Sequence, residues 1–335
     1  MIKRMRMLLS LARPAVVLLL VLFTVTGLGE AGQGENRALL ARALVVVIAY
    51  LLCSVAINDL ADEAIDRVNL PGDHRRPLVA GTASRRDLVV VAVASAAIAL
   101  AASATIGWPA LAVAAGGLAV SAAYSLRPVR LADRGAAACL VLPAGYVAVP
   151  YLIGVLSGRG TVNARDLLLL GGLYAGFIGR IALKDFRDLR GDALFGKRTF
   201  LIRHGRRRTC ELSAACWVTG MLTLVTVRNP SMALLAAWAV YLVVALWLLR
   251  ALSVDHGRRR DDALISTIAI VGRAVIVSLI AHFSTTGADW SASAQLALMT
   301  LLVAVTLAQA GKMLRLAHPA SEAVGAVAPR QTLPA

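Results

Sequence analysis

The sequence predicts an all-α fold, a polytopic transmembrane bundle of about nine or ten helices that carries two similar Asp-rich segments. Of its 335 residues, 59% are hydrophobic but only 5% are aromatic, and the mean hydropathy is +0.73. Long runs of Ala, Leu and Val are typical of membrane proteins rather than of soluble cores. Such runs recur along the whole chain, most of them near the roughly 20 helical residues that cross a bilayer. The expected spans are 8–28, 38–57, 88–106, 108–124, 136–157, 167–183, 210–227, 231–249, 263–284 and 293–310.

Basic residues are distributed unevenly between the two predicted ends of this bundle. With a cytoplasmic N-terminus, 28 of the 35 Lys and Arg residues fall on the inner side, five on the outer side, and two, Arg180 and Arg273, within spans. This positive-inside bias predicts a multi-pass protein of the cell membrane whose active site faces the cytoplasm. Basic runs such as 206–208 and 258–260 would then contact anionic lipid, so the formal charge of +16 does not indicate a nucleic-acid partner.

The chain is expected to form one domain without a transition-metal site. Residues 1–317 are predicted to be a single transmembrane domain, and residues 318–335, which are rich in Ala and Pro, a disordered C-terminal tail. The four cysteines show no paired spacing, and the five histidines include no pair at ligand spacing. Zinc and disulfide chemistry are therefore not indicated.

Two segments on the inner side resemble each other. Residues 58–66 follow one apolar run and residues 184–192 follow another, and both contain carboxylates at positions i, i+3 and i+7. On a helix these positions lie on one face within two turns. Such a face can be simply solvated, but Asp at the end of a membrane helix is costly unless it faces a polar cavity. Six carboxylates facing one another could bind Mg²⁺, which commonly shares its oxygen ligands with substrate phosphates.

These segments also resemble the two motifs of a known family, the UbiA superfamily of intramembrane prenyltransferases. Asn58-Asp59-x-x-Asp62-x-x-x-Asp66 is similar to the first motif, and Asp185-x-x-Asp188-x-x-x-Asp192 to the second. The resemblance extends from about residue 8 to 310. Ala132 departs from the pattern, because a basic residue is often found there, and ten spans would exceed the family's usual nine. The flanking matches are Arg76-Pro77-Leu78 with Gly81, Tyr124-Ser125-x-x-Pro128-x-Arg130, and Gly196-Lys197-Arg198-Thr199.

The resemblance implies a role for each matched residue. Asn58, Arg76, Ser125 and Lys184 would bind the diphosphate of an isoprenyl diphosphate, and Arg13 is a further candidate for a phosphate contact. Tyr124 would lie near the allylic C1 atom, where an electron-rich ring can stabilise a developing cation. The expected catalytic residues are Tyr124, Asp59 and Asp185. The expected Mg²⁺ ligands are Asp59, Asp62, Asp66, Asp185, Asp188 and Asp192.

The expected reaction is Mg²⁺-dependent transfer of a prenyl group from an isoprenyl diphosphate to a small aromatic acceptor, through an allylic cation in a dry cavity. The family also prenylates glycerol-phosphate-type hydroxyls, and the residues do not decide between these acceptors. The alternative is a membrane terpene synthase, which would cyclise the isoprenyl diphosphate alone. A transporter is disfavoured, because no helix-breaking Gly or Pro pair stands at matching mid-span positions.

Five residues outside the motifs have weaker functional interpretations. Arg180 and Arg273 are candidates for lining the cavity because they lie inside spans, although Arg180 is close enough to the cytoplasmic end to reach it. Tyr146, Tyr151 and Trp108 are expected in an interfacial aromatic belt or in ordinary packing rather than along a prenyl tunnel.

The charge distribution predicts which residues are accessible from each side of the membrane. In a variant without the native cysteines, single cysteines at Asp73, Arg206 and Arg258 should react with an impermeant thiol reagent only from the cytoplasmic side. A cysteine at Arg159 should react only from outside. Labelling of intact cells and of inverted vesicles measures this, and labelling of positions 73 and 159 from the same side would contradict the predicted topology.

Overall fold

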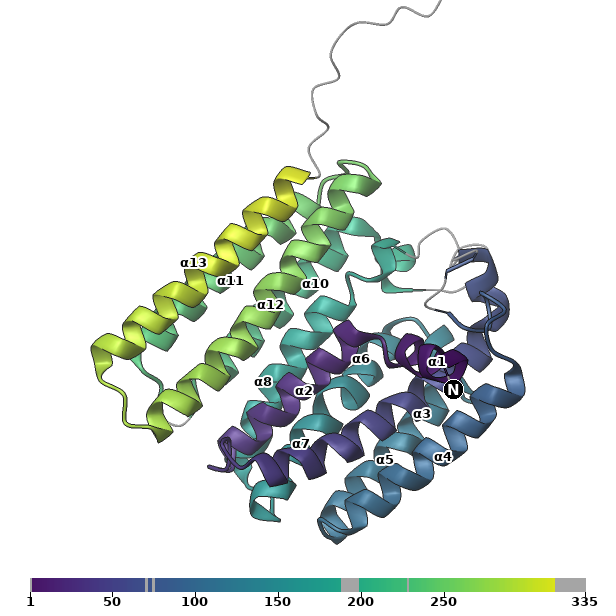
Figure 1. Cartoon of the computed structure of the whole chain (residues 1–335). Helices are drawn as coiled ribbons and strands as arrows, with labels where there is room; N and C mark the ends of the chain where they lie inside the picture. The colour runs from purple at the N-terminus through teal and green to yellow at the C-terminus, as the bar shows by residue number, and fades with distance from the viewer. Residues whose placement is uncertain (1, 70–71, 74–75, 188–198, 228, 317–335) are drawn as a thin grey trace, which may run out of the picture.

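The structure is a computed structural model that describes residues 2–69, 72–73, 76–187, 199–227 and 229–316. The regular secondary structure of its described part is all helical, and the other expected spans fall mainly within one helix or one continuous helical stretch, but the expected span 8–28 divides at Arg13 into two helices (Figure 1). The predicted tail, 318–335, lies outside the described residues. The elements are α1 (Ile2–Ala12), α2 (Pro14–Glu30), α3 (Arg37–Asn69), α4 (Arg85–Ala104), α5 (Trp108–Ser125), η1 (Leu131–Asp133), α6 (Ala136–Pro143), η2 (Ala144–Ala148), α7 (Val149–Arg159), α8 (Ala164–Ile181), α10 (Phe200–Leu224), α11 (Met232–Leu252), α12 (Arg258–Gly287) and α13 (Ala292–Leu316).

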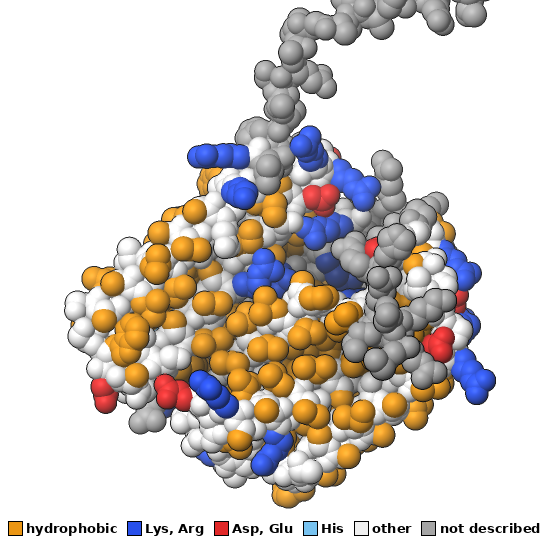
Figure 2. Space-filling model, in the orientation of Figure 1, with side chains coloured by type: hydrophobic (Ala, Val, Ile, Leu, Met, Phe, Trp, Pro, Cys, Tyr) orange, Lys and Arg blue, Asp and Glu red, His pale blue; other side chains and the backbone are white. Residues whose placement is uncertain are grey.

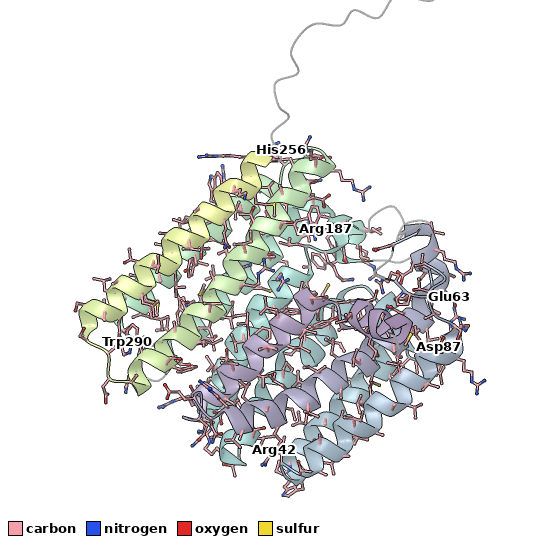
Figure 3. The ribbon with its side chains drawn as sticks, viewed as in Figure 1. Arg42, Glu63, Asp87, Arg187, His256 and Trp290 are labelled. Atoms are coloured by element: carbon pink, nitrogen blue, oxygen red, sulfur yellow. The ribbon has the colours of Figure 1, made fainter. Side chains whose placement is uncertain are left out.

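Most of these helices have the dimensions of membrane spans. In the described residues, eight helical stretches are long and apolar enough to cross a bilayer. They are α3, α4, α5, the stretch from α6 to α7, α8, α11, α12 and α13. Helix α2 is apolar but has only 17 residues, and α10 is not among the eight. Figure 3 shows Glu63, Asp87, Arg187 and His256 along one edge of the bundle, and Arg42 and Trp290 along the opposite edge. The chain therefore alternates between two edges, as the span prediction requires.

The helices form two packed groups (Figure 1). Helix α3 packs against α4 and α5 around one hydrophobic cluster, whereas α8 packs against α10, and α11 packs against α12 and α13. Helices α2 and α7 pack against each other and contribute side chains to both hydrophobic clusters. The two groups are therefore joined through the α2–α7 pair.

The α2–α7 pair depends on two glycines at its crossing. A Cβ atom at Gly27 would collide with the backbone carbonyl oxygen of Tyr151, and a Cβ atom at Gly154 would collide with that of Thr24. Small residues at helix crossings let membrane helices approach closely, where packing rather than the hydrophobic effect drives association. The crossing brings the two groups of helices together.

The stretch from α6 to α7 changes its hydrogen-bond pattern in the middle. Residues 144–148 form a π turn between Pro143 and Pro150. Pro150 lacks the N–H that would continue the α-helical ladder, and its ring would clash with the carbonyl of residue 146 in a regular helix. This local widening includes Tyr146, and π turns are frequent at functional sites.

Gly154→Ala should lower the stability of the protein, because the added methyl group cannot enter the α2–α7 crossing without separating the helices. Overpacking of this kind typically costs about 1–3 kcal/mol. The control is Gly116→Ala on the exposed face of α5, where a Cβ atom meets no neighbour. Thermal unfolding in detergent compares the two variants. An unchanged melting temperature for Gly154→Ala would show that the crossing is looser than described.

Candidate functional site

The first Asp-rich segment lies on the last turns of α3, beyond its apolar part. The helix continues to Asn69 because residues 58–69 include neither Gly nor Pro. Asp59 and Asp66 are buried, whereas Asp62 is half-buried. The helix periodicity therefore places the three carboxylates on one face, as the sequence predicted.

Two arginines from outside α3 neutralise Asp59 and Asp66. Arg13 Nη2 donates to Asp59 Oδ1 at 2.5 Å, and Arg76 Nη1 donates to the same oxygen and lies 3.2 Å from Asp66 Oδ2. Arg13 occupies the break between α1 and α2, where it takes a left-handed backbone conformation (φ 47°) directly before Pro14. This conformation is uncommon for a residue with a side chain, and such residues concentrate at functional sites.

Asp62 has a different pair of partners. Asn58 Nδ2 donates to Asp62 Oδ2 at 2.7 Å, and Arg130 Nη2 donates to Asp62 Oδ1 at 2.7 Å. Arg130 also donates to Asp133 and to the carbonyl oxygens of Ala61 and Ser125. Burial lowers the pKa of the Arg130 guanidinium, but the hydrogen bonds and charges of Asp133 and Asp62 outweigh this and raise its pKa. Arg130 therefore remains charged and ties the loop after α5 to α3.

One carboxylate oxygen on this face lacks a protein partner. Asp59 Oδ2 is buried without a hydrogen bond in the structure. Across the described residues, no group of three Asp, Glu, His or Cys side chains already converges as a metal site. The arginines hold the carboxylates in their present arrangement, so a cation entering here would compete with Arg13 and Arg76.

The second Asp-rich segment is described only at its start. Asp185 is buried directly after the turn that ends α8, and Lys184 Nζ lies 3.6 Å from Asp185 Oδ1. Asp188 and Asp192 lie outside the described residues, as do Gly196, Lys197 and Arg198 of the flanking motif. Thr199 is described, and its side chain accepts a hydrogen bond from the backbone N–H of Ile202 at the start of α10.

Residues of both segments meet at one cavity of about 320 Å³, here called the central cavity. Its polar wall contains most of the candidate residues, but Asp59 lies behind Arg13 and Arg76 rather than on the surface of the cavity. Figure 2 shows basic side chains gathered in and above a hollow beside α12, on a face that is otherwise largely hydrophobic. The candidate residues that line the central cavity are Arg13, Asn58, Asp62, Asp66, Arg76, Tyr124, Lys184 and Asp185.

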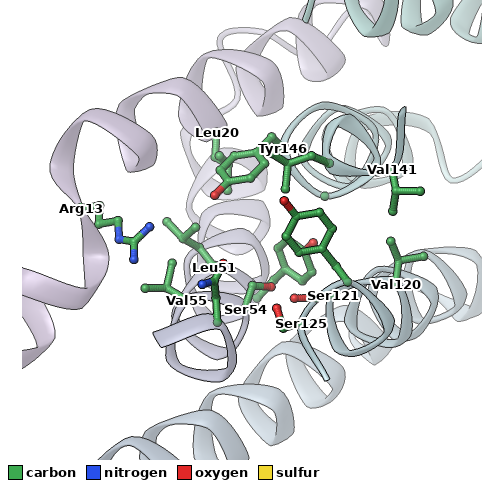
Figure 4. Close-up of a pocket in the computed structure, with 15 residues that line it drawn as sticks. Arg13, Leu20, Leu51, Ser54, Val55, Val120, Ser121, Ser125, Val141 and Tyr146 are labelled. Carbon is green, nitrogen blue, oxygen red and sulfur yellow. The ribbon is translucent and has the colours of Figure 1, made fainter. Parts of the chain in front are cut away.

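An apolar arm, here called the tyrosine arm, continues from the central cavity between α2, α3, α5 and α6. It is lined by Tyr50, Tyr124, Tyr146 and Ser125 among mainly aliphatic side chains, and it shares Tyr124 and Tyr146 with the central cavity. Figure 4 shows the Arg13 guanidinium pointing toward the space that Tyr146, Ser121 and Ser125 surround. Tyr146 packs against both hydrophobic clusters, as expected, but the π turn also places its ring on the wall of the cavity, which the sequence did not favour.

The other two aromatic residues lie away from the central cavity. Tyr151 is fully buried in the hydrophobic core, and Trp108 is 80% exposed at the start of α5, at the end of the bundle opposite the central cavity. Neither residue lines the tyrosine arm.

A second apolar recess, here called the glycine groove, leaves the central cavity between α2, α8, α10 and α12. It is lined by Gly172, Gly176, Gly220 and Gly272 together with large apolar side chains. Arg180 lines both the groove and the central cavity, so it does not simply reach the membrane edge.

Comparison with known proteins assigns the family. The sequence model of the UbiA prenyltransferase family matches residues 20–271, about three quarters of the chain. The chain belongs to the UbiA prenyltransferase family. It is an integral membrane prenyltransferase that uses an isoprenyl diphosphate.

Relatives and solved structures agree with this assignment. A digeranylgeranylglyceryl phosphate synthase of Natronomonas pharaonis is 31% identical over 268 residues, which cover 78% of this chain and 90% of the relative. The bacteriochlorophyll synthase 33 kDa chain of Rhodobacter capsulatus is 25% identical over 193 residues, 56% of this chain and 62% of that protein. The structure of an Archaeoglobus fulgidus UbiA homolog bound to DMAPP and Mg²⁺ has the same fold. It covers 92% of this chain and 99% of its own, with a TM-score of 0.57 and 17% identity.

Arg130→Ala should destabilise the protein by about 2 kcal/mol or more, because it removes charge-assisted hydrogen bonds to Asp62 and Asp133 and to two carbonyl oxygens. Arg134→Ala, in the same loop, is the control, since the Arg134 side chain is exposed. Denaturation in detergent without added metal measures the difference. Equal stability of the two variants would contradict the role of Arg130 as the tie between the loop and α3.

Proposed function

We propose that the protein catalyses the Mg²⁺-dependent transfer of a prenyl group from an isoprenyl diphosphate to a nucleophilic acceptor, in a site that faces the cytoplasm. The main observation in support is that one cavity, which continues into the tyrosine arm, is lined by Asp62, Asp66, Asp185 and Arg76. A charged wall beside an apolar arm matches an amphiphilic donor with a diphosphate at one end and a hydrocarbon chain at the other. The known relatives and the Mg²⁺ in the A. fulgidus homolog support this choice of donor and metal.

The chemistry of the donor set fits Mg²⁺. Magnesium prefers carboxylate and phosphate oxygens, and the buried, unpartnered Oδ2 of Asp59 is such an oxygen on the face that the motif defines. When bound, the metal would neutralise diphosphate oxygens and so make the diphosphate a better leaving group. The residues proposed to hold it are Asp59, Asp62, Asp66, Asp185, Asp188 and Asp192.

The basic residues of the site are proposed to exchange partners when the donor binds. Arg76 and Arg13 now neutralise Asp59, and the same guanidinium groups can reach the central cavity that they line. If bound cations held the carboxylates, these arginines would be able to donate to phosphate oxygens instead. Lys184, Asn58 and Ser125 are proposed to contribute further phosphate contacts, because each lines the central cavity or the arm beside it.

The bond that breaks joins C1 of the prenyl chain to a diphosphate oxygen, and both of its electrons leave with the diphosphate. The rings of Tyr124 and Tyr146, where the arm meets the central cavity, would stabilise the allylic cation through their electron-rich faces. The apolar lining of the arm keeps water from the cation. The acceptor then forms a bond to C1, and its displaced proton passes to the released diphosphate.

The names of the relatives support transfer to an acceptor rather than cyclisation of the donor. They include a synthase that makes a glyceryl phosphate product and a bacteriochlorophyll synthase. The small aromatic acceptor expected from the sequence stays a prediction.

Asp62→Asn and Asp185→Asn should each reduce consumption of isoprenyl diphosphate by at least roughly 10²-fold, because each removes a carboxylate proposed to hold the metal. Tyr124→Phe should be much milder, since the ring face that stabilises the cation remains. Turnover should also stop when a chelator is in excess. Release of diphosphate, normalised to correctly folded protein, measures all of these effects.

The control for charge removal is Asp289→Asn, in the exposed turn before α13, at the end of the bundle opposite the central cavity. This variant should retain wild-type turnover. If both site variants also retained it, or if the wild type turned over fully without divalent metal, the proposed mechanism would be wrong.

A further inference from the structure

The segment that follows α8 has two sides, and only one of them belongs to the central cavity. Residues 182–187 leave the regular α-helix and form a series of tight turns. Lys184 and Asp185 line the central cavity, whereas the next two residues, Phe186 and Arg187, contact α10 and α12. Side chains on such a segment are positioned by the helices that it packs against. The contacts of Phe186 and Arg187 therefore determine where Asp185 points.

Phe186 is held by Arg206 of α10. The guanidinium carbon of Arg206 lies over the Phe186 ring, 5.0 Å from its centroid. A guanidinium in this position is attracted to the electron-rich face of the ring. The Phe186 side chain also packs against the hydrophobic cluster to which α8, α10, α11 and α12 contribute. These two contacts restrict the ring, and Phe186 directly follows the proposed metal ligand Asp185 in the sequence.

Arg206 is itself immobilised by the start of α12. Its Nη1 donates to Asp261 Oδ1 at 3.0 Å, and its Nη2 donates to Asp261 Oδ2 at 2.6 Å. A bidentate pair of this kind fixes the orientation of the guanidinium as well as its charge. Arg206 Nη1 also donates to the carbonyl oxygen of Leu252, at the end of α11. The next residues of the basic run, Arg207 and Arg208, are exposed, so Arg206 alone of the three is turned toward buried Asp261.

Arg187 makes a second connection to α12. Its Nε donates to Asp262 Oδ1 at 3.2 Å, and its Nη2 donates to the carbonyl oxygen of Asp262 at 3.2 Å and to Ser266 Oγ at 2.8 Å. Asp262 directly follows Asp261, so two neighbouring residues of the segment after α8 are both connected to the first turns of α12. The side chains that make these connections are here called the α12 clamp, and they are Phe186, Arg187, Arg206, Asp261 and Asp262.

The α12 clamp differs from the arginines that contact the first Asp-rich segment. Arg13 and Arg76 bind Asp59 directly and line the central cavity, whereas no member of the clamp is among the residues that line it. The clamp can therefore influence the chemistry only through the position of Asp185. Groups that orient a metal ligand from outside the site commonly matter in this way, and their loss typically costs about 10- to 100-fold in metal affinity or activity.

We propose that Arg206 is a positioning residue for the reaction: paired with Asp261, it holds Phe186 and so keeps the Asp185 carboxylate turned toward the central cavity. This inference rests on the proposed Mg²⁺-dependent prenyl transfer and names the residues that prepare its second carboxylate segment. All contacts of the clamp are between protein groups, so they can form before metal and donor bind. Binding then requires less ordering of the segment, which strengthens it.

The test measures metal binding directly, with the full chain in lipid nanodiscs, Mn²⁺ as the metal and a non-ionisable thiodiphosphate analogue of the donor. Electron paramagnetic resonance reports free Mn²⁺ during the titration. Arg206→Gln should weaken Mn²⁺ binding about tenfold or more. Arg206→Lys, which keeps a positive charge near the ring, should recover part of the loss. The control is Arg207→Gln, because the exposed Arg207 pairs with Glu211 of its own helix, and it should bind Mn²⁺ as the wild type does.

Phe186→Leu separates positioning from stability. Arg206→Gln leaves the buried Asp261 without its bidentate partner, which also destabilises the protein. Phe186→Leu keeps that pair and an apolar side chain, and removes only the aromatic face beneath the guanidinium. It should weaken Mn²⁺ binding about threefold, with little change in melting temperature.

Two further measurements locate the effect in the second Asp-rich segment. In turnover, both variants should raise the Mg²⁺ concentration that gives half-maximal rate, while the KM of the donor at saturating Mg²⁺ changes little. In the metal-free protein, backbone amides of residues 182–187 should exchange with solvent faster in both variants than in the wild type, because the segment opens more often. Amides of residues 58–66 should exchange at the wild-type rate.

Failure of the clamp and failure of the proposed function give different results. If the wild type neither bound Mn²⁺ with the analogue nor consumed isoprenyl diphosphate, prenyl transfer itself would be wrong. If the wild type did both, but Phe186→Leu bound Mn²⁺ as tightly as the wild type, prenyl transfer would stand and the positioning role of Arg206 would be overturned. A loss of stability in Arg206→Gln alone would then show that the Arg206–Asp261 pair supports only the fold.

Discussion

Neutralising the carboxylates at the end of α3 is the constraint on which the rest of the site depends. Three aspartates share one helix face where the bundle meets the membrane edge, and unpaired charges there would be strongly unfavourable. The chain meets this requirement with Arg13, Arg76 and Arg130, each supplied by a different segment. Those contacts join the α1–α2 break, the loop after α3 and the loop after α5 to one helix. The same electrostatic requirement therefore organises both the fold at this end and the candidate site.

The fold and the first Asp motif could be predicted from sequence because each follows from a local rule. Bilayer thickness fixes the length of apolar helices, so even the weakly polar segment 293–310 was correctly expected to form a helix, α13. Helix periodicity alone places Asp59, Asp62 and Asp66 on one face. The resemblance to the UbiA superfamily identified further residues, and Arg76 and Tyr124 indeed line the central cavity. These predictions needed no knowledge of tertiary packing.

The features that the sequence did not reveal all depend on contacts between distant segments. The position of the Tyr146 ring on the cavity wall was not favoured by sequence, because its direction is determined by the π turn between two prolines rather than by a regular helix. Arg180 was only a weak candidate, since its position at the junction of two recesses requires α8 to pack against α10, α12 and α2. Arg130 belongs to a motif, but nothing in the motif indicated that its side chain would bind Asp62. The two residues are 68 positions apart in the sequence.

The central claim is that the aspartate face of α3 exchanges its arginine partners for metal and diphosphate. The most direct measurement is a crystal structure of the protein with Mn²⁺ in place of Mg²⁺ and a non-ionisable thiodiphosphate analogue of the donor, using the anomalous signal to locate the metal. The account predicts Mn²⁺ between the α3 carboxylates and Asp185, with Arg13 and Arg76 turned from Asp59 toward the diphosphate. Metal bound elsewhere, or a diphosphate bound while both arginines remain on Asp59, would contradict it.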